Sequence, residues 1–190
     1  MRKIFRTKIP DFLKVNYEEW GREYKEKRNE DKRFKFYWHS KYEDIIDLLA
    51  LMTNDHCSFY DGFELGAQSR KTIEHFRPKS VFPLLAYDWY NLFLSCDACQ
   101  SAKRENFEEG LLKPDVDGYS FSRYFIMNYD GSIDINKKAS LEDQKRAEIT
   151  IRLYKLNRIE LKKSRKSQLK YFIKCNDLEI NDMPYRFMFE

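Results

Sequence analysis

Apolar side chains recur at helical spacing in four stretches of the chain. Each stretch begins near a polar residue that is followed three positions later by an acid. Such a pair caps the first turn of a helix, because both side chains accept hydrogen bonds from backbone N–H groups that lack partners. The four pairs are Asn16 with Glu19, Ser40 with Glu43, Ser140 with Asp143, and Asn157 with Glu160. The pattern therefore predicts four helices, of which the first ends near Arg28 and the second near Thr53 and Asn54.

The apolar face of each predicted helix is expected to lie in the core. The four faces consist of Tyr17, Trp20 and Tyr24; of Ile45, Ile46, Leu48, Leu49 and Met52; of Ala147, Thr150, Ile151 and Tyr154; and of Leu161, Leu169, Phe172 and Ile173. The basic residues of the last helix are expected on its outer side. Residues 26–35 are strongly charged and are expected to form an exposed loop.

The centre of the chain lacks helical spacing as far as Cys96, and two of its segments, 72–76 and 92–95, are expected to form short strands. A short helix is expected after Cys96, where Ala and Lys become frequent. The centre is therefore expected to follow the order strand, loop, strand, helix.

A second pair of strands is expected nearer the C-terminus. The Asp-Gly turn signal within 129–132 predicts a β-hairpin that pairs residues 125–127 with residues 133–135. The chain is therefore expected to be an α+β protein whose small β-containing core lies between N-terminal and C-terminal helices.

Composition agrees with a folded protein, since hydrophobic residues make up 42% of the 190 positions and aromatic residues 16%. No apolar run reaches the roughly eighteen residues of a membrane span, and no apolar segment follows the basic N-terminus. A cytoplasmic location without membrane contact is therefore expected. We expect one compact domain with a helical region at 1–54, the β-containing core at 55–112, a hairpin with basic helices at 113–175, and a tail at 176–190.

Positive charge is concentrated near the C-terminus. The chain as a whole carries a formal charge of +4, but between Lys145 and Lys174 eleven basic residues face only Glu148 and Glu160. Two interpretations stay open: this segment binds a polyanion, or its lysines and arginines form an ordinary solvated helix face.

The central region also carries candidate catalytic residues. Glu74 and His75 are adjacent, Asn91 follows His75 after sixteen residues, and Gln100 follows Asn91 after nine. A neutral imidazole can activate water near pH 7, and a hard divalent cation takes carboxylate or amide oxygens, so these residue types suit phosphodiester hydrolysis. Because neighbours on a strand point to opposite faces, Glu74 and His75 need a local twist to serve one site.

The four cysteines are Cys57, Cys96, Cys99 and Cys175. In a reducing compartment, the C-x-x-C spacing of Cys96 and Cys99 is typical of a metal site rather than of a disulfide framework. Cys175 is distant in sequence and is expected to pack in the core.

The order of these parts resembles the ββα-metal, or HNH, nuclease motif. The most specific string is I-E-H-F-R-P-K-S at 73–80, followed by W-Y-N-L-F-L-S-C-D-A-C-Q-S-A-K at 89–103. The amino-acid sequence at 86–92 and 147–157 is similar to that of one branch of the family, the retron- and Septu-associated HNH proteins of bacterial anti-phage defence. The resemblance covers most of the chain from about 45 to 170, and it implies that 55–112 forms an HNH core.

The resemblance also implies a role for each central residue. Glu74 is a ligand of the catalytic Mg²⁺ or Mn²⁺, and His75 is the general base. Asn91 holds the loop that orients the base, and Gln100 stands at the position of the second metal ligand. The family usually has His or Asn at that last position, so Gln100 is a departure that moves the ligand oxygen outward by one methylene.

Many proteins of this family brace the hairpin with a zinc knuckle of two C-x-x-C pairs. Cys96 and Cys99 form one pair here, whereas Cys57 is followed by Tyr60 where the second cysteine is expected. Two interpretations stay open: a degenerate three-cysteine zinc site, or loss of zinc with the thiols packed as small hydrophobic groups. The candidates for a fourth zinc ligand are His56 and Asp61.

Four basic residues flank the candidate catalytic residues: Arg77, Lys79, Lys103 and Arg104. Such cations position phosphates without reading sequence, so they are expected to contact nucleic acid. The alternative is that they are ordinary surface charges, as most lysines and arginines are.

The resemblance therefore implies a metal-dependent HNH endonuclease that acts on DNA, or alternatively on RNA, in phage defence. It further implies an ABC-type ATPase partner, and the retron members add a reverse transcriptase with its DNA or RNA. The departures at Tyr60 and Gln100 keep open a weakened or inactive HNH fold that serves as a nucleic-acid-binding or assembly subunit. A zinc-knuckle binding module without catalysis is a third interpretation.

The tail is rich in aromatic residues between Pro184 and Phe189. Aromatic residues next to an arginine, here Arg186, are typical of interface anchors, so the tail is expected to dock on the ATPase partner. The alternative is a terminal strand that packs on the protein's own sheet.

Overall fold

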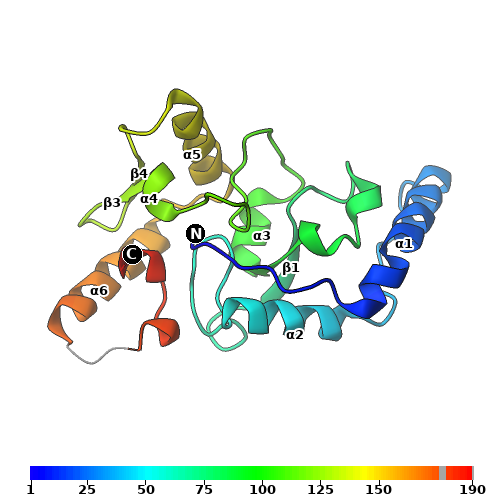
Figure 1. Ribbon diagram of the computed structural model, residues 1–190, viewed down its shortest axis with the longest axis horizontal. Helices are drawn as coiled ribbons and strands as arrows, with labels where there is room; N and C mark the ends of the chain where they lie inside the picture. Colours follow the sequence, from blue (N-terminus) through cyan, green and yellow to red (C-terminus); the bar gives the residue numbers. More distant parts are fainter. Residues whose placement is uncertain (176–178, 190) are drawn as a thin grey trace.

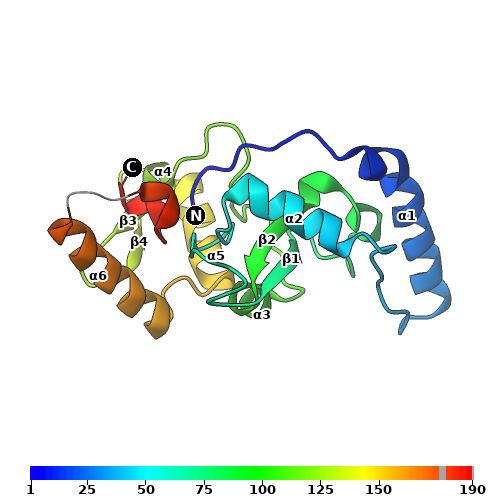
Figure 2. The same ribbon diagram turned by 90° about the horizontal axis from the view of Figure 1, so that it is seen from below.

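The computed structural model describes residues 1–175 and 179–189 and has the mixed α+β architecture that the pattern predicts. The helices are α1 (Asp11–Glu30), α2 (Tyr42–Thr53), α3 (Asp97–Lys103), α4 (Phe121–Tyr124), α5 (Leu141–Leu153) and α6 (Ile159–Lys174). The strands are β1 (Lys71–His75), β2 (Leu92–Cys96), β3 (Phe125–Met127) and β4 (Ile133–Ile135). Figures 1 and 2 show an elongated molecule with α1 at one end and α6 at the other.

The centre of the molecule is a hairpin of β1 and β2, which pair antiparallel with His75 opposite Leu92 and Lys71 opposite Cys96. We call it the central hairpin. Helices α2 and α3 lie on its two sides (Figure 2), so both of its faces are covered. This explains why β2 is buried along its whole length and begins with three consecutive apolar residues, Leu92–Leu94, rather than with an alternation of apolar and polar residues. Strand, loop, strand and short helix follow one another as predicted.

The second hairpin also has the predicted register, with Phe125 opposite Ile135 and Met127 opposite Ile133. The turn between its strands brings Gly131 against α6. A Cβ on Gly131 would clash with the carbonyl oxygen of Lys162, and the φ of +86° also favours glycine. The close approach of turn and helix therefore requires glycine at this position.

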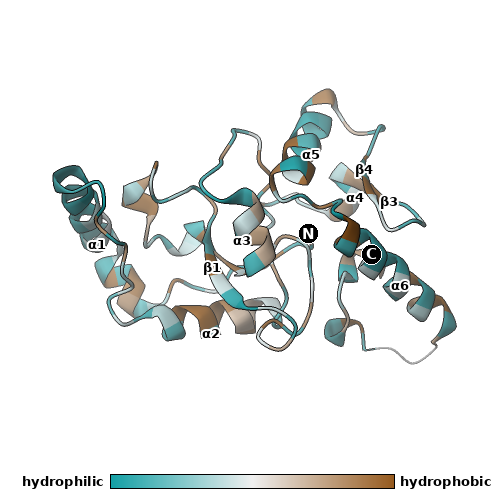
Figure 3. Ribbon diagram, turned by 180° about the vertical axis from the view of Figure 1, so that it is seen from behind, coloured by the Kyte–Doolittle hydropathy of each residue, from teal (hydrophilic) through white to brown (hydrophobic). Residues whose placement is uncertain are grey.

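The helices differ in polarity according to their place in the fold. Figure 3 shows α1 and α6, at the two ends, as mainly hydrophilic, whereas α2 beside the central hairpin carries much of the hydrophobic colour. Among the described residues, every helix is too short or too polar to cross a membrane.

Two of the predicted helix caps are wrong at the N-terminal end of the chain, although α2 ends at Thr53 as predicted. Helix α1 begins at Asp11 after Pro10, and Asn16 lies inside it with its amide donating to the carbonyl of Phe12. Proline favours this start because its fixed φ suits the entry to a helix. The same helix continues to Glu30, so the first part of the predicted exposed loop is helical. Helix α2 begins after Lys41 without a side-chain cap, and Ser40 has a positive φ instead.

The predicted cap of α5 is confirmed, but that of α6 is wrong. Ser140 accepts a hydrogen bond from the backbone N–H of Asp143 at 3.1 Å. Asn157 instead clamps the second hairpin, since its Oδ1 accepts from the N–H of Ile133 at 2.8 Å and its Nδ2 donates to the same residue's carbonyl at 2.7 Å. On α6, Ile173 was expected in the core and is 68% exposed, whereas Arg165 was expected on the outer side and is fully buried.

The described part of the tail packs into the protein's own core. Tyr185, Arg186 and Phe187 are all buried, and the ring of Phe187 stacks on Phe121 with 4.3 Å between centroids. The segment forms a 3-10 turn rather than a strand, so neither an exposed aromatic anchor nor a terminal strand is present there. Residues 176–178 of the tail's acidic stretch lie outside the described residues.

The tail is held by a buried ion pair between Arg186 and Asp61. Arg186 Nη2 lies 2.7 Å from Asp61 Oδ1, and the backbone N–H of Arg186 donates to Oδ2 at 2.6 Å. Removing one partner of a buried pair leaves an uncompensated charge in a medium of low polarity. The free energy of unfolding therefore depends strongly on this contact.

We predict that Asp61→Asn lowers the free energy of unfolding by about 3–5 kcal/mol, because the guanidinium of Arg186 loses its counter-charge. Denaturant titration followed by circular dichroism measures this change. The matched control is Asp47→Asn, an exposed acid on α2, which is expected to shift the value by less than about 0.5 kcal/mol. Equal stability of the two variants would contradict the anchoring role of the pair.

Candidate active site and thiol cluster

A cavity of about 270 Å³ lies where the central hairpin opens towards its connecting loop. We call it the hairpin cavity; it is lined by Glu74, His75, Pro78, Lys79, Gln100, Arg104 and Glu105. Glu74 and His75 both line it although they are adjacent on β1 and keep a regular register with β2. The end of the strand, rather than a break in its pairing, allows the two side chains to reach one space.

His75 is anchored in one orientation within this cavity. Its Nε2 lies 2.9 Å from the carbonyl oxygen of Ala86, and because a carbonyl can only accept, Nε2 carries the proton and Nδ1 keeps its lone pair. Burial, with the positive charges of Lys79 and Lys103, lowers the pKa of His75 to about 3. The imidazole is therefore neutral at pH 7 with its lone pair on Nδ1, and the same burial makes it a weaker base than a free imidazole.

Aromatic side chains from the segment between α1 and α2 hold the imidazole on its sides. The ring of Trp38 stacks on His75 with 5.5 Å between centroids, and Phe36 meets it edge-on at 5.4 Å. His75 is thus a packing residue as well as a candidate base. These two contacts were not predicted from the sequence. The aromatic run from Phe34 to Trp38 is the signal that would have indicated them.

Glu74 forms a buried ion pair that was also not predicted from the sequence. Lys103 Nζ lies 2.6 Å from Glu74 Oε1 and 3.0 Å from the carbonyl oxygen of His75. Burial raises the pKa of Glu74 to about 7, against the lowering effect of Lys103. Lys103 is fully buried, so it is an internal counter-charge here and not the exposed phosphate contact that was expected.

Asn91 ties together the two ends of the loop that connects β1 to β2. Its Oδ1 accepts from the N–H of Arg77 at 2.8 Å, and its Nδ2 donates to the carbonyls of Arg77 and Leu85, each at 3.0 Å. This loop carries the Ala86 carbonyl that fixes His75. Asn91 therefore lies outside the cavity but makes the contacts that a loop-holding role requires.

Gln100 reaches the cavity from α3. Its Nε2 donates to the carbonyl of Ile73 at 3.0 Å, which leaves Oε1 as the amide atom available to a cation. The cations at the rim are placed differently from one another. Lys79 and Arg104 line the cavity. Arg77 lies outside it, between the rings of Phe82 and Phe107 at 5.2 Å from each centroid.

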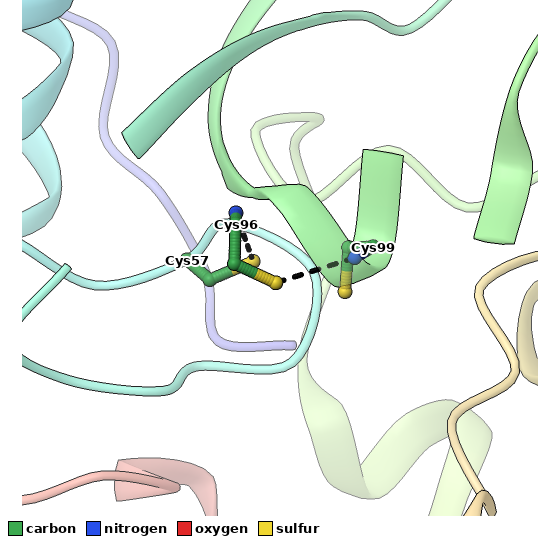
Figure 4. Close-up of side chains that lie close together, drawn as sticks. All are labelled: Cys57, Cys96 and Cys99. Carbon is green, nitrogen blue, oxygen red and sulfur yellow. Dashed lines mark hydrogen bonds between the residues drawn. The ribbon is translucent and has the colours of Figure 1, made fainter. Parts of the chain in front are cut away.

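The other end of the central hairpin holds three buried thiols, Cys57, Cys96 and Cys99, whose sulfur atoms lie within 4.8 Å of one another (Figure 4). We call them the thiol cluster. Cys96 Sγ accepts from the backbone N–H of Cys99 at 3.2 Å, which caps α3. Hydrogen bonds from the two other thiols lower the pKa of Cys96 to about 3, whereas burial raises that of Cys57 to about 12. The cluster therefore favours one shared thiolate.

The residues considered as a fourth ligand are engaged elsewhere. His56 Nε2 lies 3.0 Å from the carbonyl of Met183, its Nδ1 contacts the carbonyl of Asn54, and Asp61 pairs with Arg186. Burial and the neighbouring thiols raise the pKa of Tyr60, so its phenol stays protonated. Three sulfur atoms are thus what the described residues offer to a metal here. Their spacing fits tetrahedral Zn²⁺, whose bonds to sulfur are about 2.3 Å long.

Comparison with known proteins gives two distant relatives, and no family model matches the chain. The chain is 27% identical over 157 residues to Septu protein PtuB of Bacillus mycoides, which covers 66% of this chain and 50% of that protein. It is 33% identical over 72 residues to Septu protein PtuB of Bacillus thuringiensis, which covers 36% of this chain and 28% of that protein. The chain thus matches at most half the length of these curated relatives. Both relatives are named Septu proteins. Septu is one of the two defence systems, retron and Septu, whose HNH proteins the sequence motif resembles.

Proposed function

We propose that the chain is a metal-dependent HNH-type endonuclease that cleaves nucleic acid as part of a Septu-like anti-phage defence. The observation that carries the proposal is the hairpin cavity, in which Glu74, Gln100 and a neutral His75 share one space. The similarity to proteins named Septu protein PtuB supports the biological setting. DNA is the favoured substrate, with RNA as the alternative.

In this proposal His75 is the general base. The Ala86 carbonyl holds the Nε2 proton and directs the lone pair of Nδ1 away from that anchor. A water molecule beside the scissile phosphate gives its proton to Nδ1 as its oxygen attacks phosphorus. The P–O bond on the opposite side breaks, and the sugar oxygen that leaves takes a proton from solvent. The rings of Trp38 and Phe36 keep the imidazole from rotating, so the base stays aligned between turnovers.

Glu74 and Gln100 would hold the catalytic Mg²⁺ or Mn²⁺. Because Oε1 of Glu74 is bound to Lys103, Oε2 is the carboxylate oxygen left for a cation, and Gln100 adds Oε1 of its amide. When bound, such an ion supplies charge stabilisation at the phosphate. Lys79 and Arg104 at the rim are proposed to contact neighbouring phosphates, with Arg77 just outside.

The same site has a feature that favours a second candidate function. Lys103 already neutralises Glu74 at 2.6 Å, and Gln100 replaces the usual second ligand, so divalent affinity is expected to be low. An HNH fold with weakened catalysis that serves as a nucleic-acid-binding or assembly subunit would retain this geometry. In either case the proposed setting includes an ABC-type ATPase partner.

For the thiol cluster we propose a structural Zn²⁺ held by Cys57, Cys96 and Cys99, with a fourth position that no side chain of the described residues fills. The metal would fix the start of α3, which carries Gln100 and Lys103 to the cavity. Three thiolates hold zinc less firmly than four, because one position stays open to water and to competing chelators.

We predict that His75→Ala lowers the rate of divalent-dependent plasmid nicking by about 10²–10⁴-fold, because the general base is lost. The variant also loses its packing against Trp38, so rates are referred to the folded fraction measured by near-UV circular dichroism. His39→Ala is the matched control, since His39 stacks on Trp20 in the same aromatic region but does not line the cavity. A folded His75→Ala protein that nicks at the wild-type rate would refute the proposed function.

We predict that Gln100→Ala raises the Mg²⁺ or Mn²⁺ concentration needed for half-maximal nicking by about tenfold or more, because a ligand oxygen is removed. Gln100→His and Gln100→Asn keep a ligand atom and are expected to retain or improve metal affinity. The control is Gln68→Ala, at an exposed position away from the cavity. Identical metal titrations for Gln100→Ala and wild type would remove Gln100 from the ligand set.

We predict that protein loaded with zinc and then desalted holds one Zn²⁺ per chain and loses it to EDTA, as expected for three thiolate ligands. Elemental analysis measures the content. Cys99→Ser is expected to lower it severalfold, whereas Cys175→Ser, outside the thiol cluster, leaves it unchanged. Zinc that survives the chelator at full occupancy would contradict the three-ligand site, and so would zinc retained in Cys99→Ser.

A further inference from the structure

Helix α6 presents a row of lysines on its outer side. Lys163, Lys166, Lys170 and Lys174 are all exposed, and steps of three and four residues place them on one stripe of the helix. We call this row the lysine stripe. At a rise of about 1.5 Å per residue it is roughly 16 Å long. None of the four forms an ion pair with a residue that the structure describes.

The other cations of the same helix are used within the fold. Lys162 lies 3.0 Å from Asp130, and the buried Arg165 donates to the carbonyls of Gly131 and Leu156 at 2.6 and 2.7 Å. The lysine stripe has no comparable structural use. Like charges at spacings of four residues cost a helix a few tenths of a kcal/mol per pair. The stripe therefore lowers the stability of α6, and no ion pair with another described residue offsets this cost.

The chemistry of the stripe favours a polyanion as its occupant. Four ammonium groups in a line, with no acid among them on that side, match a row of phosphates. Lysine is depleted at the centres of protein–protein interfaces, so an acidic protein partner is the weaker fit. The exposed Tyr171 and Ile173 flank the stripe between Lys170 and Lys174, and the exposed Ile159 lies one turn before Lys163.

We infer that the lysine stripe binds the sugar-phosphate backbone of duplex DNA, at a surface separate from the hairpin cavity. The inference rests on the proposed function and extends it, since it gives the substrate a second contact on α6, at the end of the molecule opposite α1 (Figure 1). Contacts of this kind carry no sequence information, but they fix the position of the duplex relative to a catalytic centre.

The test is the salt dependence of DNA binding by the full chain. Fluorescence anisotropy with a short labelled duplex is recorded in EDTA, where no cleavage occurs, between about 50 and 200 mM salt. Each phosphate contact contributes about −0.9 to the slope of log K against log salt. Lys166→Gln combined with Lys170→Gln is therefore expected to reduce the steepness of the slope by about 1.8 and to weaken binding at low salt.

The matched control replaces Lys14 and Lys25, two exposed lysines of α1, with glutamine. It removes the same charge at the other end of the molecule and is expected to leave the slope unchanged. The inference is overturned if the stripe variant keeps the wild-type slope or if both double variants change it equally. It is also overturned if the stripe variant binds DNA normally but fails to co-purify with the ATPase partner.

Failure of the proposed function gives a different result. A wild-type chain that does not nick DNA in Mg²⁺ or Mn²⁺, but whose slope still depends on the stripe, would be a binding subunit. The lysine stripe would then stand while the catalytic proposal falls. If wild type nicks DNA normally and the stripe variant keeps the wild-type slope, the catalytic proposal stands and the inference about the lysine stripe falls.

Discussion

The antiparallel pairing of β1 with β2 is the constraint on which both candidate sites depend. It places His75 opposite Leu92 at one end and Lys71 opposite Cys96 at the other. The first end opens into the hairpin cavity, and the second holds the thiol cluster. Cys57 joins that cluster because its neighbour, Ser58, donates its backbone N–H to the carbonyl of Leu94 at 2.9 Å. A shift in strand register would disturb both sites at once.

Helix α3 connects the two ends of the hairpin. It begins at the thiol cluster, where Cys96 caps it, and runs back along β1. Gln100 then meets the Ile73 carbonyl at 3.0 Å, and Lys103 meets Glu74 at 2.6 Å. The geometry of the thiols therefore sets the first turn of the helix that supplies the cavity with an amide oxygen and a counter-charge. A structural change at the thiols would therefore shift Gln100 and Lys103 through this helix.

Buried cations join parts of the chain that are distant in sequence. Lys103 pairs with Glu74, Arg186 pairs with Asp61, and Arg165 donates to backbone carbonyls near the second hairpin. In each case the charge lies in a medium of low polarity and depends on its partner. These contacts hold the tail and the basic helices in defined places. The ammonium groups of the lysine stripe, in contrast, remain exposed to solvent.

The sequence by itself determined the features that local chemistry controls. These are the second hairpin, through its Asp-Gly turn, the Ser140 cap of α5, and the strand–loop–strand–helix order that brings Glu74, His75 and Gln100 to one cavity. The tertiary structure alone decided that Asn157 clamps a hairpin instead of capping a helix, and that Lys103 is buried. Spacing and propensity act within a few residues, whereas burial and ion pairing depend on partners such as Glu74, which lies 29 residues from Lys103. Only the assembled fold brings such partners together.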